Sequence, residues 1–160
     1  MIHHSVAREF GYPAGPLFAL IADIGSYPDY MPGWRSVRIL ARTGERIDVE
    51  QAIGILGLEL VFHSVAEVAA PLRLAIRASD GPSQPFRQFA LDWTFTELAP
   101  DRTQVRAAIT IEFRSSVLEH AAALAVPVVV ERVVDAVERR AAARLGVPAA
   151  TAAQDNDPTR

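Results

Sequence analysis

Apolar and polar residues alternate with a period of two over most of the chain between residues 37 and 114. The cleanest run lies at 104–114, where one side carries Val105, Ala107, Ile109, Ile111 and Phe113. Such alternation is typical of a strand with one buried face. We therefore expect strands at 37–42, 46–53, 60–68, 72–78, 89–95 and 104–114, preceded by a first strand at 2–10.

One long helix is predicted after the last strand, over residues 116–145. At about 1.5 Å per residue it is roughly 45 Å long, which suits the span of a curved sheet. The pattern Ser116-x-x-Glu119 predicts a capping box at its start, and Gly146 marks its end. Pro127 lies inside the helix, so we expect a kink or break near 123–126, where a proline removes a backbone hydrogen bond.

Two shorter segments lie between the first strand and the others. Gly15-Pro16 precedes an apolar group at 17–21, which predicts a short helix. Two prolines and two glycines at 25–34 predict a short helical turn or a packed loop. The short turns between strands favour an antiparallel meander, and the fold class is therefore α+β.

Composition indicates a single domain. The chain has 160 residues, half of them hydrophobic, and a net charge of −3 that gives no electrostatic case for binding DNA. It has no cysteine, no run of about 20 apolar residues and no apolar signal segment, so we expect a soluble, cytoplasmic protein. Residues 1–146 are expected to form the domain and 147–160 a disordered tail.

Candidate catalytic chemistry is sparse. The four histidines show no metal-ligand spacing, and no Ser-His-Asp order, phosphate loop or nucleotide motif appears. The sequence therefore predicts no catalytic residue and no metal site. Charged residues of the long helix are expected to form a solvated face, comprising Glu131, Arg132, Asp135, Glu138, Arg139, Arg140 and Arg144.

Several short motifs, taken in order, resemble the polyketide cyclase/START-like (SRPBCC) superfamily. They are Asp23-x-x-x-Tyr27-Pro28-x-Tyr30-x-Pro32, Val37-Arg38, Asp80-Gly-Pro, Pro85-Phe86, Trp93-x-Phe95, Ile111-Glu-Phe113-Arg114-Ser115 and the run 134–140. The nearest branch is that of the coenzyme-Q-binding proteins and the ribosome-association toxin. The resemblance spans residues 2–146 and implies a helix-grip fold: a curved antiparallel meander around a long C-terminal helix, with two short helices after the first strand.

The chain departs from that branch in two loops. The family usually has tryptophan directly after Pro32, whereas this chain has Gly33 and then Trp34. The family's Gly-Pro-Phe turn is interrupted by three residues, Ser83, Gln84 and Pro85.

The resemblance implies an apolar cavity between sheet and helix. From side-chain direction we expect it to be lined by Val49, Gln51, Ile53, Leu60, Phe62, Ser64, Leu74, Ile76, Leu91, Trp93, Ile109 and Ile111, with Tyr30, Met31 and Trp34 at its mouth. Gln51 and Ser64 are polar positions in apolar rows and are candidates to orient a head group. The alternatives are a dry core and, for the aromatic segment, a hydrophobic plug or a membrane-touching edge.

By resemblance, the expected function is non-enzymatic binding or transport of a hydrophobic small molecule, an isoprenoid quinone such as ubiquinone that supports respiration. A bound quinone would be its only, non-covalent cofactor. Such a role implies transient membrane contact and a cytoplasmic location that extends to the periphery of the inner membrane. Two alternatives stay open. One is a polyketide aromatase/cyclase or dehydrase, and the other is an interaction protein that associates with the ribosome.

Overall fold

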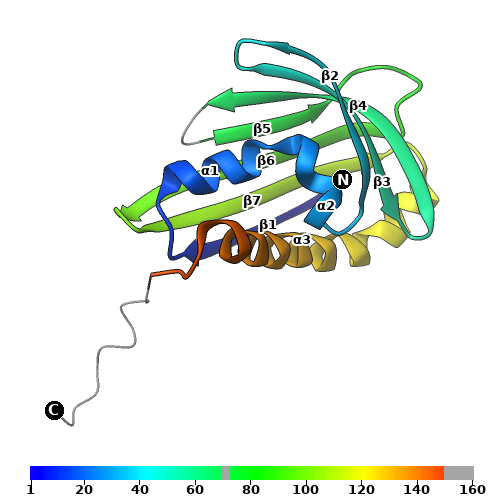
Figure 1. Cartoon of the computed structure of the whole chain (residues 1–160). Coiled ribbons are helices and arrows are strands. Elements are labelled where there is room, and N and C mark those ends of the chain that lie inside the picture. Colours follow the sequence, from blue (N-terminus) through cyan, green and yellow to red (C-terminus); the bar gives the residue numbers. More distant parts are fainter. Residues whose placement is uncertain (70–72, 150–160) are drawn as a thin grey trace, which may run out of the picture.

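Within residues 1–69 and 73–149, the part of the chain that the computed structural model describes, seven antiparallel strands form one curved sheet. A long helix lies along its concave side (Figure 1). The strands are β1 (Ile2–Phe10), β2 (Trp34–Thr43), β3 (Arg46–Ile55), β4 (Leu58–Ala69), β5 (Arg73–Ala78), β6 (Phe86–Ala99) and β7 (Arg102–Phe113). The helices are α1 (Ala14–Ala22), the 3-10 turn η1 (Ile24–Ser26), α2 (Tyr27–Tyr30) and α3 (Ser116–Leu145).

The strand order is β1-β7-β6-β5-β4-β3-β2. Strands β2 to β7 pair with their neighbours in the chain, and β1 joins the sheet beside β7. This arrangement confirms the predicted α+β helix-grip fold and each expected strand. Residues 71 and 72, the predicted turn and start of the fifth strand, lie outside the described residues.

The core lies between the concave face of the sheet and one stripe of α3. The buried residues of α3 recur every three or four positions, which is the pattern of a helix with one apolar face. They are Ala122, Val126, Val130, Val133, Val134, Ala136, Val137 and Ala141. All are alanine or valine, so the helix backbone can lie close to the sheet. Helix α1 covers another part of this face through Leu17, Phe18 and Ile21.

The start of α3 differs from the predicted capping box by one residue. The cap is Ser115, whose hydroxyl oxygen accepts a hydrogen bond from the Leu118 N–H at 3.2 Å. Ser116 is already inside the helix, whereas Ser115 keeps the extended backbone that a cap requires. Glu119 instead accepts a hydrogen bond from the Phe113 N–H at 2.8 Å, which ties the helix start to the end of β7.

Of the kink or break expected near residues 123–126, a break is absent, because α3 is one continuous helix. In Figure 1 the first turns of α3 (yellow) tilt away from the axis of the later turns (orange). A proline removes one backbone donor and crowds the preceding turn, which bends a helix without necessarily ending it. Val126 and Val130 are buried on either side of Pro127, and their packing holds both turns against the sheet.

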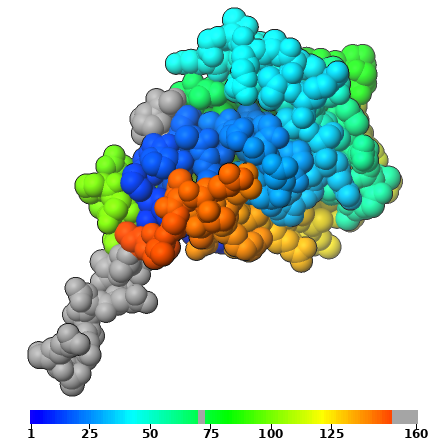
Figure 2. Space-filling model, viewed as in Figure 1, coloured from blue at the N-terminus to red at the C-terminus, as the bar shows by residue number. Residues whose placement is uncertain are grey.

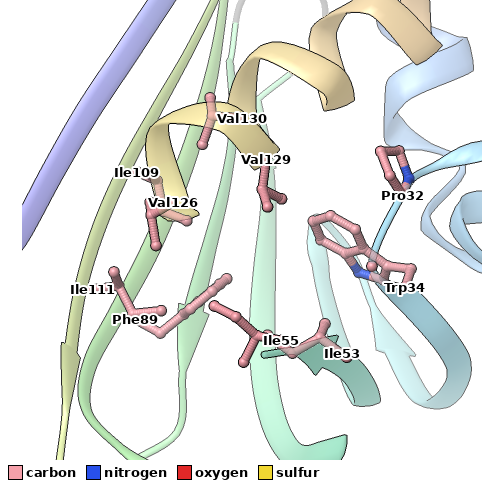
Figure 3. Close-up of a pocket in the computed structure, with 12 residues that line it drawn as sticks. Pro32, Trp34, Ile53, Ile55, Phe89, Ile109, Ile111, Val126, Val129 and Val130 are labelled. Carbon is pink, nitrogen blue, oxygen red and sulfur yellow. The ribbon is translucent and has the colours of Figure 1, made fainter. Parts of the chain in front are cut away.

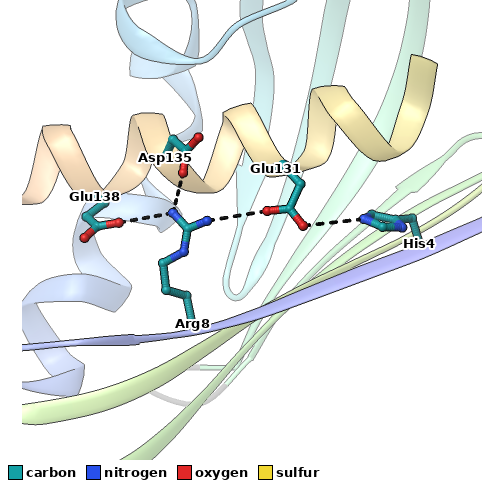
Figure 4. A network of polar contacts seen from close by, with 5 residues as sticks. All are labelled: His4, Arg8, Glu131, Asp135 and Glu138. Atoms are coloured by element: carbon teal, nitrogen blue, oxygen red, sulfur yellow. Dashed lines mark hydrogen bonds and ion pairs between the residues drawn. The ribbon is translucent and has the colours of Figure 1, made fainter. Parts of the chain in front are cut away.

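A polar cluster joins the edge strand β1 to α3 (Figure 4). Arg8 donates hydrogen bonds to Asp135 at 2.5 Å, Glu138 at 3.1 Å and Glu131 at 3.5 Å. His4 lies 4.0 Å from Glu131. The helix pattern alone indicated that these acids form a solvated face. In the structure they contact β1 through Arg8, so the face is not purely solvated.

Two further expectations concern the ends and the environment of the domain. The expected tail begins with described residues, and the Ala149 N–H donates to the Gly11 carbonyl at 2.9 Å. Residues 150–160, the rest of that tail, lie outside the described part. None of the described helices is long and apolar enough to cross a membrane.

Candidate ligand cavity

An apolar cavity lies between the first half of α3 and one end of the sheet (Figure 3). It is lined by Pro32, Gly33, Trp34, Ile53, Gly54, Ile55, Phe89, Ile109, Ile111, Val126, Val129 and Val130. Figure 3 shows Val129 pointing from the helix toward the space near Trp34 and Ile55. None of the twelve lining residues is titratable, so the lining offers neither an acid nor a base.

The loop before β2 places Trp34 at the cavity. Gly33 has a φ of 89°, a backbone conformation that a side chain makes costly, and its carbonyl accepts a hydrogen bond from the Gly54 N–H at 2.7 Å. Trp34 then begins β2 opposite Ile53. The departure from the family pattern at Gly33 therefore has a local structural reason, because glycine suits this turn and the tryptophan follows it.

A buried polar chain holds the Trp34 indole. Trp34 Nε1 donates to Gln51 Oε1 at 2.8 Å, and Gln51 Nε2 donates to Ser64 Oγ at 2.6 Å. Gln51 and Ser64 are each 1% exposed. The Tyr27 ring also packs edge-on against Trp34, with 5.6 Å between ring centroids. Gln51 thus bonds to both Trp34 and Ser64, and of these three residues only Trp34 lines the cavity.

The cavity is small in this conformation, with a volume of about 60 Å³. A water molecule needs roughly 10–15 Å³ by the same kind of measure, whereas small-molecule sites have volumes of about 300–1,000 Å³. The cavity therefore has room for a few waters, and a ligand of any size requires its walls to move apart.

The residues predicted from alternation fall into three groups. Trp34, Ile53 and Ile109 line the cavity, as does Ile111. Leu60 is half-buried at the edge of the core, and Tyr30 lies beside a different hollow along α3. The rest are buried elsewhere in the interior, namely Met31, Val49, Gln51, Phe62, Ser64, Leu74, Ile76, Leu91 and Trp93.

Sequence reasoning missed most of the remaining lining. Phe89 belongs to the same apolar row as Leu91 and Trp93, so its face could have been found from alternation. The three helix valines flank Pro127 at helical spacing, which was the available signal on α3. Among the described residues, no group of three or more His, Asp or Glu side chains is arranged to hold a metal ion.

Comparisons with known proteins agree with this architecture. The ribosome association toxin RatA of Escherichia coli strain K12 is 24% identical over 108 residues, which make up 68% of this chain and 66% of that protein. The aligned part is thus just under two thirds of the toxin's length.

Two solved structures share the fold at low sequence identity. The aromatase/cyclase ZhuI from Streptomyces sp. R1128 has a TM-score of 0.75 and 20% identity, over 95% of this chain and 97% of that one. A START superfamily protein from Mycobacterium smegmatis has a TM-score of 0.74 and 20% identity, over 86% of this chain and 95% of that one. Residues 10–138 match the model of one protein family. The chain therefore belongs to the polyketide cyclase / dehydrase and lipid transport family.

Proposed function

We propose that this protein binds or carries a hydrophobic small molecule, an isoprenoid quinone of the ubiquinone type, in the cavity under the first half of α3. The observation that carries the proposal is the predominantly apolar lining between helix and sheet. Burial of apolar surface contributes about 25 cal/mol per Å², which drives such a molecule from water into the cavity. The only polar hydrogen of a lining side chain is the Trp34 N–H, which already bonds to Gln51.

Exposed apolar side chains beside the cavity support transient contact with a membrane. Leu56 follows the lining residue Ile55 and is 51% exposed, although its φ of 51° is unusual for leucine. Val128 precedes the lining residue Val129 and is 49% exposed, and Leu124 is 85% exposed on the same helix. Exposed apolar groups close in sequence to the lining suit a peripheral encounter with lipid, where a quinone resides.

The proposal is tested by titrating the protein with a short-chain ubiquinone and following tryptophan fluorescence. In a Trp93→Phe background Trp34 is the only tryptophan, because the chain has two. A quinone in the cavity should quench this single fluorophore with a saturable dependence on concentration. Lack of saturable quenching, with the fold intact by circular dichroism, would contradict quinone binding.

Two neighbouring valines provide a matched pair of variants. Val129→Phe adds a ring to a cavity-lining position, and Val128→Phe adds the same ring to an exposed one. We expect Val129→Phe to weaken binding at least about tenfold, the equivalent of about 1.4 kcal/mol, because the added ring occupies the cavity. Val128→Phe should leave affinity unchanged, and equal affinities for the two variants would place the quinone outside this cavity.

A second candidate function, association with the ribosome, is favoured by the match to RatA. Co-sedimentation of the protein with ribosomal subunits tests it directly. The likeness to ZhuI concerns the fold, and a cyclase needs a positioned acid or base that the lining does not offer. The geometry therefore supports binding over cyclisation.

A further inference from the structure

A second hollow lies near the other end of α3, where its last turns meet α1, η1 and α2. Figure 2 shows this seam between the blue N-terminal helices and the orange end of α3. Its volume is about 350 Å³, within the range of small-molecule sites. Arg140, on this hollow, is about 15 Å along the helix from Val130 of the apolar cavity, so the two are separate sites.

Two arginines of α3 line this hollow. Arg140 and Arg144 are four residues apart, so they lie one turn from each other on the same side of the helix. The Arg140 guanidinium carbon lies 4.8 Å from the centroid of the Tyr30 ring, a stacked position that fixes its direction. Neither arginine forms an ion pair with a residue in the ranges 1–69 and 73–149. In contrast, three acids of the same helix bond to Arg8.

Tyr30 also lines this hollow and carries a hydroxyl group. Its oxygen is buried, and none of the described residues gives it a hydrogen-bond partner. Buried polar atoms without partners are rare and mark places where a ligand or water completes the structure. Burial raises the pKa of Tyr30, and the nearby Arg140 lowers it by less. The hydroxyl therefore stays protonated at neutral pH and can donate a hydrogen bond.

One acid, Asp23, also lines the hollow and accepts a hydrogen bond from the Ser26 hydroxyl at 2.6 Å. The lining of the hollow thus carries two positive charges against one negative charge, and its residue Tyr30 has an unpartnered hydroxyl. Arginine in the last turn is also favoured by the helix dipole, but that effect does not account for the buried Tyr30 hydroxyl.

We propose that this hollow binds a small molecule through a phosphate or carboxylate group, held by Arg140 and Arg144 with a third hydrogen bond from the Tyr30 hydroxyl. Guanidinium groups match the geometry of both oxyanions with paired hydrogen bonds. The volume exceeds that of the oxyanion alone, so the ligand is an organic anion whose remainder lies against the apolar side chains of α1. This site is independent of quinone binding in the cavity.

The test is a titration of the full chain with inorganic phosphate and, separately, with succinate at constant ionic strength, followed by amide NMR shifts. We expect saturable shifts confined to residues 16–30 and 140–145. Arg140→Gln and Arg144→Gln should each weaken binding about tenfold, in line with the loss of a charge-assisted hydrogen bond. The control is Arg139→Gln, an arginine of the same helix that does not line this hollow.

Three results would overturn the proposal. One is a failure of both anions to give saturable shifts. Another is that Arg139→Gln weakens anion binding as much as Arg140→Gln and Arg144→Gln do, which would indicate that the anion is attracted by the overall positive charge of the helix. The last is binding of poly-uridylate RNA or anionic vesicles without binding of phosphate or succinate, which would assign this surface to a macromolecule or a membrane.

A Tyr30→Phe variant separates ligand binding from a purely structural role. The hydroxyl has no partner, so its removal should leave the melting temperature of the empty protein unchanged or higher. The rise in melting temperature on adding phosphate or succinate should become smaller, because the stabilisation by a ligand grows with the logarithm of the ratio of its concentration to Kd. An unchanged ligand-induced rise would show that the Tyr30 hydroxyl takes no part.

Discussion

Trp34 links the apolar cavity to the interior of the sheet. Its ring lines the cavity, while its N–H ends a chain of two buried hydrogen bonds through Gln51 to Ser64. A buried polar group that loses its partner costs about 1–3 kcal/mol, more than the net value of the hydrogen bond itself. The orientation of Trp34 therefore depends on residues that do not touch the cavity.

Replacing Gln51 with leucine tests this dependence. Gln51→Leu leaves the Trp34 N–H and the Ser64 hydroxyl without their partner, so the free energy of unfolding should fall by about 2 kcal/mol in urea titrations. Adding Ser64→Ala to the same chain should recover part of that loss, because one unpaired group is removed. A Gln51→Leu protein as stable as the wild type would contradict the role of this chain.

All three tyrosines of the chain should titrate abnormally. Burial raises the pKa of Tyr27 well above its usual value of 10.0, and burial also raises the pKa of Tyr30 and of Tyr12. Because the folded-state pKa is the higher one, stability is fully present below about pH 10 and is lost as the pH rises beyond it. Ultraviolet absorbance should show tyrosinate from Tyr27 and Tyr30 only well above pH 10. Ionisation of all three tyrosines together near pH 10 would rule this out.

At the scale of residues, the sequence predicts which face of the sheet a side chain occupies better than it predicts how deeply that side chain is buried. Trp93 and Ile109 lie in apolar rows that face the same side of the sheet, yet Trp93 is wholly buried in the core and Ile109 lines the cavity. Alternation reports which face a side chain occupies, whereas the path of α1 and α3 across that face decides what covers it. The start of α3 shows a similar limit of sequence-based prediction. Ser115 and Ser116 both precede the same apolar run, and only the backbone geometry shows that Ser115 is the helix cap.

Among the elements, α3 has a local weak point beside the cavity. Pro127 lies between the lining residues Val126 and Val129, and it lacks the N–H that would donate to the Ala123 carbonyl. A ligand must widen a cavity of about 60 Å³, and the first half of α3 is the wall in which a proline leaves one backbone hydrogen bond unmade. The proposed entry route therefore passes under these turns.

The variant Pro127→Ala tests this role of the helix. Restoring the hydrogen bond should raise the free energy of unfolding by about 1–3 kcal/mol, because an interior proline costs up to about 3 kcal/mol. Quinone association, measured by stopped-flow fluorescence, should become slower because the helix resists opening. A stabilised protein with an unchanged association rate would show that α3 does not open at Pro127.

The contact between β1 and α3 makes a separate prediction. Arg8→Met leaves three carboxylates near one another without their shared cation. Their side chains are about half exposed, so solvent screening limits the expected loss of stability to about 1–2 kcal/mol at low salt, and less at high salt. The control Arg38→Met removes one exposed ion pair with Glu50 and should cost little. Equal losses in both variants would contradict a special role for the cluster.

Whole-molecule architecture could be predicted because most strands have one buried face and short turns join most of them. The pairing of β1 with β7 is not a local feature, and periodicity and short turns did not predict it. The cavity could not be located in the same way, since it lies where Gly33, Gly54 and the valines of α3 meet from distant parts of the chain. The position of the cavity depends on how the helices and strands pack together, which a local sequence pattern does not report.

The central claim is that a hydrophobic ligand enters between α3 and the sheet. The most direct measurement is an intermolecular NOE experiment on the methyl-labelled protein with a short-chain ubiquinone. We predict NOEs from the quinone to the methyl groups of Ile53, Ile109 and Val129, and none to the exposed Leu98 and Val117. NOEs confined to exposed methyl groups, or no saturable change at all, would contradict the account.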